Sequence, residues 1–219
     1  WKVPVTAGNR DKAKELLAAL AKAEFDEEAD TFRNRREKDR FVTIMAKRFL
    51  DAEEEFWTQG FRPAYLEKKI ESFTLTLTDG TDVVLHGKVD RIDVDEHGNF
   101  IIVDYKSGAY PLPVMTIEQE IFQLPVYAVM ARRSLADKDP SLRRTVGLAY
   151  YDLSGKNKGP ARDLVLYDKE ALDDQPSTKP KASPKSAEEF EAVLTMSIDS
   201  ARRAIEGIRS GNFFAEPRD

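Results

Sequence analysis

Two acidic residues and a lysine, Asp90, Asp104 and Lys106, occupy positions from which they could act on one reacting group. The aspartates flank the turn DEHGN at 95–99, which contains the Gly and Asn that hairpin turns favour. If positions equidistant from the middle of this turn are paired, Asp90 lies opposite Asp104 to within a residue. Side chains alternate along a strand, so one sheet face would carry a set of eight residues. They are Lys88, Asp90, Ile92, Val94, Phe100, Ile102, Asp104 and Lys106, with Lys88 opposite Lys106.

The charged end of this predicted face favours a cation site. Opposed residues have Cβ atoms ~5 Å apart, and like charges there are destabilising unless something compensates them. Mg²⁺ and Mn²⁺ bind through one or two carboxylates and leave other positions to water and substrate phosphates. Lys106 would then place an ammonium beside a scissile phosphate. The alternative is a surface hairpin in which Lys106 forms a salt bridge with either aspartate.

Three short motifs carry these residues in a fixed order. They are Gly87-Lys88-Val89-Asp90-Arg91-Ile92-Asp93, Val103-Asp104-Tyr105-Lys106-Ser107-Gly108 and Gln123-Leu124-Pro125-Val126-Tyr127-Ala128. Together they resemble the nuclease motifs of the PD-(D/E)xK superfamily, and in particular those of RecB- and AddB-type exonucleases and their CRISPR-associated relatives. The resemblance covers residues 63–128 well and the flanking helices loosely. The motifs are specific together, although each alone is weak.

The resemblance implies a role for each matching position. Asp90 and Asp104 would be metal ligands, Lys106 the catalytic lysine, and the backbone carbonyl of Tyr105 a further ligand. Gln123 and Tyr127 would contact nucleic acid or support the site, and their four-residue spacing places both on one helix face. A plain core helix with one Gln and one Tyr is the structural alternative.

A glutamate upstream of Asp90 is a further metal-ligand candidate by resemblance. Glu67 occupies roughly the place of the family glutamate, and Glu71 competes for that assignment. For either residue, a solvated glutamate at a strand edge is as good an interpretation as a metal ligand.

The sequence departs from the family pattern on an early helix, where many RecB-type nucleases place a histidine near the metal. The two histidines of this chain are His86 and His97, and both are expected to be exposed and structural. The helix expected over 36–57 offers only carboxylates there, such as Asp51 or Glu55. The ligand set is therefore incomplete by comparison with the family.

The absence of cysteine excludes disulfides, thiolate zinc sites and a cysteine-ligated iron-sulfur cluster within these residues. Some relatives carry such a cluster after a segment that resembles residues 208–214. Either its cysteines lie beyond this chain, or this member lacks the cluster, which we favour.

The overall composition is that of a globular protein with one sizeable core. The chain has 219 residues, 41% hydrophobic and 33% charged, and no apolar run approaches the ~20 residues of a membrane span. A net charge of -5 argues weakly against a general nucleic-acid-binding surface. Residues 33–48 nevertheless hold seven basic and two acidic side chains, which indicates either a basic helix face or a solvated charged helix.

Hydrophobic periodicity predicts an α/β fold, with a central mixed sheet and helices on both sides. Strands are expected near 70–78, 83–94, 100–106 and 145–153, with 164–167 as a further candidate, and helices over 11–25, 36–57, 116–134 and 186–209. We expect one domain over 1–219. It would comprise a helical part at 1–60, a catalytic core at 63–153, a flexible loop at 173–185 and a C-terminal helix at 186–210.

These observations predict a Mg²⁺- or Mn²⁺-dependent DNA nuclease. By resemblance it would be an exonuclease of DNA repair or recombination, joined to a helicase and acting in the cytoplasm, and the start at Trp1 suggests a piece of a longer protein. One alternative is a catalytically silent domain that binds nucleic acid or acts as a scaffold. Another is a hairpin that binds Ca²⁺ structurally, in which case Lys106 would oppose the cation with no catalytic return.

Overall fold

The computed structural model describes residues 4–26, 32–40, 44–58, 60–106, 123–136, 138–140, 142–152, 162–172 and 183–212. The helices among them are α1 (Arg10–Asp26), α2 (Phe32–Arg40), α3 (Ala46–Thr58), α5 (Gln123–Ala136), α6 (Lys169–Leu172) and α7 (Ala187–Arg209). The strands are β1 (Arg62–Thr76), β2 (Asp82–Val94), β3 (Asn99–Lys106), β4 (Arg144–Asp152), β5 (Arg162–Asp168) and β6 (Ser183–Lys185). No helix within these ranges is long and apolar enough to cross a membrane.

The described strands form one mixed sheet in the order β1-β2-β3-β4-β5-β6. β1, β2 and β3 pair antiparallel, β4 runs parallel to β3, β5 is antiparallel to β4, and β6 is parallel to β5. A parallel step needs a crossover connection, and α5 lies in the one between β3 and β4. The predicted α/β class is confirmed, β5 contains the further candidate strand at 164–167, and β6 extends the sheet beyond the strands expected.

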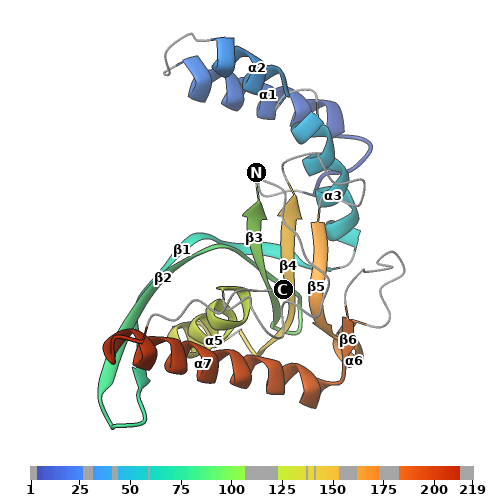
Figure 1. The fold of residues 1–219 in the computed structure, drawn as a ribbon. Coiled ribbons are helices and arrows are strands. Elements are labelled where there is room, and N and C mark those ends of the chain that lie inside the picture. Colours follow the sequence, from blue (N-terminus) through green and yellow to red (C-terminus); the bar gives the residue numbers. More distant parts are fainter. Residues whose placement is uncertain are drawn as a thin grey trace.

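Helices cover both faces of this sheet (Figure 1). On one face α5 and α7 pack over Ile92, Ile102 and Leu148, each fully buried. On the other face α3 packs over Ile101 and Val103. Burial of each such side chain contributes roughly 1.5–3 kcal/mol, so the central strands are held from both sides.

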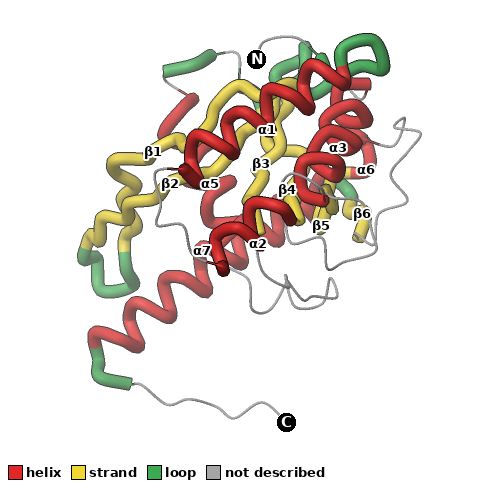
Figure 2. The backbone as a smooth tube through the Cα atoms, turned by 90° about the horizontal axis from the view of Figure 1, so that it is seen from above, coloured by secondary structure: helices red, strands yellow, loops and turns green. Residues whose placement is uncertain are grey.

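β1 and β2 are much longer than the other strands and curve away from β3 over α5 and α7 (Figures 1 and 2). Polar contacts hold the far end of this hairpin to α7. The Thr78 amide donates to Glu206 Oε1 at 2.8 Å, and Arg202 Nε donates to the Thr76 carbonyl at 2.9 Å. α1 and α2 lie beyond the C-terminal ends of β3 and β4 (Figure 1).

The expected pairing of β2 with β3 is confirmed over the residues that pair. Val94 lies opposite Phe100 and Ile92 opposite Ile102, and Asp95 accepts the backbone amides of the turn. The expected pairing of Lys88 with Lys106 is wrong, because β2 leaves β3 before that point and Lys88 lies opposite Lys69 of β1.

Helix and loop boundaries agree in part with the sequence prediction. The helix expected over 36–57 corresponds to α2 and α3, and residues 41–43 between them lie outside the described residues. The end of the loop expected over 173–185 forms β6, and residues 173–182 lie outside the described residues. Residues 116–122 of the helix expected over 116–134 also lie outside them. α7 begins where expected, because Ser186 caps it and forms a capping box with Glu189.

Candidate active site

Asp90 and Asp104 lie where β2 and β3 separate. The pairs of these strands end at Arg91 and Val103, and the next positions in the same register are the two aspartates. Oδ2 of Asp90 accepts a hydrogen bond of 2.9 Å from the Tyr105 amide, which ties the first acid to the strand that carries the second. Asp104 is 4% exposed and Asp90 is half-buried. The structure therefore brings the two predicted acids to the same end of the hairpin.

Lys106 and Gln123 both contact the Asp104 carboxylate. Nζ of Lys106 lies 2.6 Å from Oδ2, and Nε2 of Gln123 donates to Oδ1 at 2.9 Å. Lys106 also donates to Oε1 of Gln123 at 3.2 Å, and its ammonium lies 5.1 Å from the centre of the Tyr150 ring. Because Gln123 lies on α5, the position of that helix helps to set where acid and ammonium meet.

The electrostatics of Asp104 are those of a buried acid near a second acid. Burial raises the pKa of Asp104, the Lys106 ammonium opposes that rise, and Asp90 adds to it; the net shift is upward. The negative charge of Asp104 is thus disfavoured in this environment unless a positive charge lies beside it.

The donor set fits a small divalent cation. The buried Oδ2 of Asp104 accepts no well-directed hydrogen bond from the described residues, and its close neighbour there is the ammonium of Lys106. Among the described residues no three histidine, cysteine or acidic side chains converge. Two carboxylates suit Mg²⁺ or Mn²⁺, which keep several positions for water and phosphate, better than Ca²⁺, which takes six to eight oxygen ligands.

Glu67 and Lys88 form an ion pair with each other, and the charge of Asp90 also acts on Lys88. Glu67 stands opposite Asp90 across β1 and β2, with a positive φ of 51°, and its carboxylate forms an ion pair with Lys88. Glu71 is exposed. Metal ligation by Glu67 stays a prediction, as does ligation by the Tyr105 carbonyl.

The residues that could replace the family histidine near the metal do not complete the site. His86 and His97 are exposed, as expected of structural residues. Asp51 is bound by Lys47 and Arg10, and Glu55 is half-buried. None of them joins the two aspartates in a group of three within the described chain.

Tyr127 lies against β2, one helical turn beyond Gln123. A Cβ built on Gly87 would lie 3.0 Å from Cε1 of Tyr127 and 3.2 Å from Cε of Met130. Gln123 reaches the acids and Tyr127 packs beside the hydrophobic core. The predicted shared face of these two residues is present, and the position of Tyr127 agrees with a supporting role.

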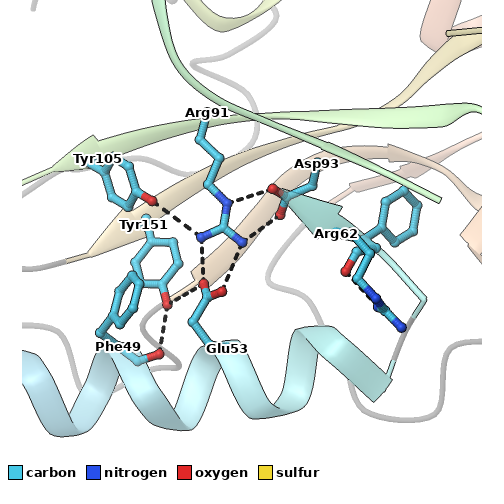
Figure 3. Close-up of polar contacts among 8 residues, drawn as sticks. Phe49, Glu53, Arg62, Arg91, Asp93, Tyr105 and Tyr151 are labelled. Atoms are coloured by element: carbon cyan, nitrogen blue, oxygen red, sulfur yellow. Dashed lines mark hydrogen bonds and ion pairs between the residues drawn. The ribbon is translucent and has the colours of Figure 1, made fainter. Parts of the chain in front are cut away.

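Behind the acids, on the α3 side of the sheet, is a buried polar network that the sequence analysis missed (Figure 3). Arg91, 2% exposed, binds Asp93 through Nε at 2.6 Å and Glu53 through an η nitrogen at 2.6 Å. Burial alone lowers the pKa of Arg91, but the two carboxylates outweigh it and raise that pKa, so the guanidinium stays charged. Tyr105 and Tyr151 complete the network.

Only part of this network had a signal in the sequence. Arg91 and Asp93 are charged residues that alternate with the apolar Ile92 and Val94 in the part of β2 that pairs with β3, and such residues are rarely buried without partners. Glu53 carried no signal, because it is one of several acidic residues on a charged helix, and which of them turns inward depends on how α3 packs.

Comparison with known families adds one finding. A family model described as the PD-(D/E)XK nuclease superfamily matches residues 4–219. No curated protein matches the sequence.

Proposed function

The chain belongs to the PD-(D/E)XK nuclease superfamily, and from that premise we propose that it is a metal-dependent deoxyribonuclease whose centre is formed by Asp90, Asp104 and Lys106. The observation that carries the proposal is the convergence of a buried carboxylate, a second acid and an ammonium at the point where β2 leaves β3. Members of this superfamily are typically nucleases that use divalent metal ions.

Each residue of the centre has a distinct task. Asp90 and Asp104 would hold Mg²⁺ or Mn²⁺, which lowers the pKa of a bound water and offsets charge on the scissile phosphate. Lys106 supplies a second positive charge where negative charge develops on the phosphate oxygens. Gln123 contacts both Asp104 and Lys106, so it fixes the ammonium relative to the acid.

The finer part of the proposal rests on the motif resemblance. We propose DNA as the substrate and an exonuclease role in repair or recombination, in the cytoplasm and alongside a helicase, because the motifs at 87–93, 103–108 and 123–128 resemble those of RecB- and AddB-type enzymes. A catalytically silent nucleic-acid-binding domain is the alternative outcome of the test.

Metal-dependent cleavage is the direct test. Linear and circular DNA are incubated with the protein in Mg²⁺, Mn²⁺, Ca²⁺ or EDTA, alongside Asp104→Asn, Lys106→Met and the control Asp82→Asn, which changes an exposed acid elsewhere on β2. We expect cleavage in Mg²⁺ or Mn²⁺, its loss in EDTA, and a fall of about 100-fold or more in both site variants but not in the control. Cleavage of linear DNA alone supports the exonuclease role.

Thermal unfolding gives a second readout that does not depend on turnover. Mn²⁺ at about 100 times its Kd should add about 2.7 kcal/mol to the free energy of unfolding of the wild type, and much less to that of Asp104→Asn. Binding of DNA with no cleavage in any metal would favour the silent domain. Cleavage that survives EDTA or both site substitutions would contradict the proposal.

A further inference from the structure

The network behind the acids places three charged side chains in the protein interior. Every nitrogen of the Arg91 guanidinium is engaged: the η nitrogens bind Glu53 Oε1 and Oε2 at 2.6 and 3.1 Å, while Nε and one η nitrogen bind the Asp93 oxygens at 2.6 and 3.0 Å. Asp93 is fully buried, and the Glu53 side chain is 13% exposed. α3 is therefore joined to β2 through charged groups that water barely reaches.

Stability alone is a poor explanation for this arrangement. Removing two or three charges from water costs several kcal/mol per ion, and apolar residues of similar volume often stabilise such a position as well or better. The surrounding cluster already contains well-packed apolar side chains, including Phe56, Val103 and Tyr151. What charged groups add over apolar ones is directional contact, which fixes the position of the strands that carry them.

The network contacts the backbone neighbours of the site residues. Arg91 follows Asp90 directly, and one of its η nitrogens lies 3.3 Å from the Tyr105 hydroxyl. Tyr105 stands between Asp104 and Lys106, and its amide binds the Asp90 carboxylate. The buried network thus connects β2 to β3 just beyond their last paired residues, where the backbones of the two strands no longer pair.

Tyr151 adds a third strand to the same group. Its hydroxyl donates to the Phe49 carbonyl at 3.0 Å and lies 3.2 Å from Glu53 Oε1. The preceding residue, Tyr150, has its ring beneath the Lys106 ammonium on the opposite face of the sheet. Glu53 therefore contacts Arg91, the neighbour of Asp90, directly, and reaches Tyr105, between Asp104 and Lys106, through Arg91.

We propose that Glu53, Arg91 and Asp93 are positioning residues that set the spacing of Asp90 and Asp104, so that α3 determines the affinity of the hairpin for its metal ion. This inference rests on the proposed function. It assigns to α3 a role in metal binding that acts through Arg91 and not through direct ligation by Glu53.

The test compares variants by the Mn²⁺ concentration that gives half-maximal cleavage and by the Mn²⁺ Kd from calorimetry. Glu53→Gln keeps the shape of the side chain and removes its charge, while Tyr105→Phe removes one hydroxyl contact and leaves the buried charges paired. The control is Arg144→Met. Arg144 lies at the other end of β4, and the change breaks its ion pair with the buried Asp168 of β5. Melting temperatures are measured for all of them.

We expect Glu53→Gln to raise both Mn²⁺ constants about 10- to 100-fold, the usual range for loss of a group that orients a metal ligand. Much of the rate should return at saturating Mn²⁺. Tyr105→Phe should show a smaller rise in the same direction. Arg144→Met should lower the melting temperature and leave both constants at their wild-type values.

The outcomes separate this inference from the proposed function. A wild type that neither binds Mn²⁺ nor cleaves DNA overturns both. If the wild type is active and both Glu53→Gln and Tyr105→Phe keep its half-saturating Mn²⁺ concentration, the positioning role is wrong and the proposed function stands. Equal effects in Arg144→Met would also overturn the positioning role, because general destabilisation would then explain them. Should Glu53→Gln fail to fold, the result for Tyr105→Phe decides.

Discussion

Lys106 and a metal ion would compete for the carboxylate of Asp104. The ammonium lies 2.6 Å from Oδ2, so without a metal it is the positive charge that favours the ionised form of the buried carboxylate. A cation that binds the same oxygen must displace the ammonium or share the oxygen with it. Gln123 Oε1 already accepts a hydrogen bond from Nζ and gives the displaced ammonium a place next to the site.

Removing the Lys106 ammonium should therefore strengthen metal binding and weaken catalysis. We expect Lys106→Met to bind Mn²⁺ about tenfold more tightly at pH 8, which corresponds to roughly 1.4 kcal/mol of removed repulsion. Cleavage should fall about 100-fold or more, because charge stabilisation in the transition state is lost. Calorimetry with Mn²⁺ and a cleavage assay on the same preparation measure both effects.

Lys69→Met is the matched control, since it removes an exposed lysine on β1 and should change neither quantity. Weaker Mn²⁺ binding in Lys106→Met would show that the ammonium supports the metal site and does not compete with it.

At the scale of elements, β2 changes the side it presents to the core near Asp90. Val89 and Ile92 both belong to the cluster under α5 and α7, although residues three apart on a regular strand face opposite ways. Across the pair, Glu67 has a positive φ, a conformation that is uncommon for residues with a side chain. The rotation lets β1 and β2 follow α5, and it turns Lys88 away from the site.

The close approach of β2 to α5 makes Gly87 a sensitive position. In Gly87→Ala the new methyl group would lie 3.0 Å from Tyr127 and 3.2 Å from Met130, so these side chains of α5 must give way by a few tenths of an ångström. We expect a loss of about 1–3 kcal/mol in the free energy of unfolding, as for other overpacked sites. Because Gln123 lies on the same helix, we expect the disturbance of α5 to lower cleavage as well. Denaturant unfolding and the cleavage assay measure the two effects.

Gly80→Ala on the hairpin turn provides a contrast. Its Cβ would meet nothing within 4 Å, but its φ of +80° disfavours any side chain, so that variant should lose stability without losing cleavage by folded protein. Unchanged stability in Gly87→Ala would show that α5 does not rest on β2 as closely as described.

At the scale of the whole molecule, Tyr65 ties the edge strand β1 to the connection that follows α5. Its hydroxyl donates to the Asp139 carboxylate, and that hydrogen bond, with burial and the charge of Asp139, raises the pKa of Tyr65 to about 12. A raised tyrosine pKa means that the folded state holds the proton more tightly than the unfolded chain. The stabilisation is therefore complete below pH ~10 and is lost as the pH rises towards 12.

Tyr65→Phe should reveal this contribution. At pH 8 the variant should be about 1 kcal/mol less stable than the wild type, a value that allows for screening of a partly exposed pair. Towards pH 12 the difference should shrink to near zero, because the wild-type tyrosine then ionises beside Asp139. Urea unfolding at pH 8 and at pH 11 measures it. A difference that does not change with pH would contradict the assigned hydrogen bond.

Patterns along the chain were enough to predict the local geometry of the site. Strand alternation and the turn at 95–99 fixed the pairing of β2 with β3, and so the opposition of Asp90 and Asp104. The four-residue spacing placed Gln123 and Tyr127 on one helix face. These features follow from periods of two and 3.6 residues and from turn chemistry, which act between residues close along the chain.

The surroundings of those residues depend on how the helices pack against the sheet, which no local pattern predicts. Glu53 meets Arg91 across 38 positions of sequence, and no local pattern distinguishes it from the neighbouring acids on α3. Lys88 was predicted on the sheet face of the two aspartates, opposite Lys106, and pairs with Glu67 instead, because β2 rotates where it follows α5. Such contacts depend on how sheet and helices pack as layers, and the free energy of that packing is shared among all the buried side chains.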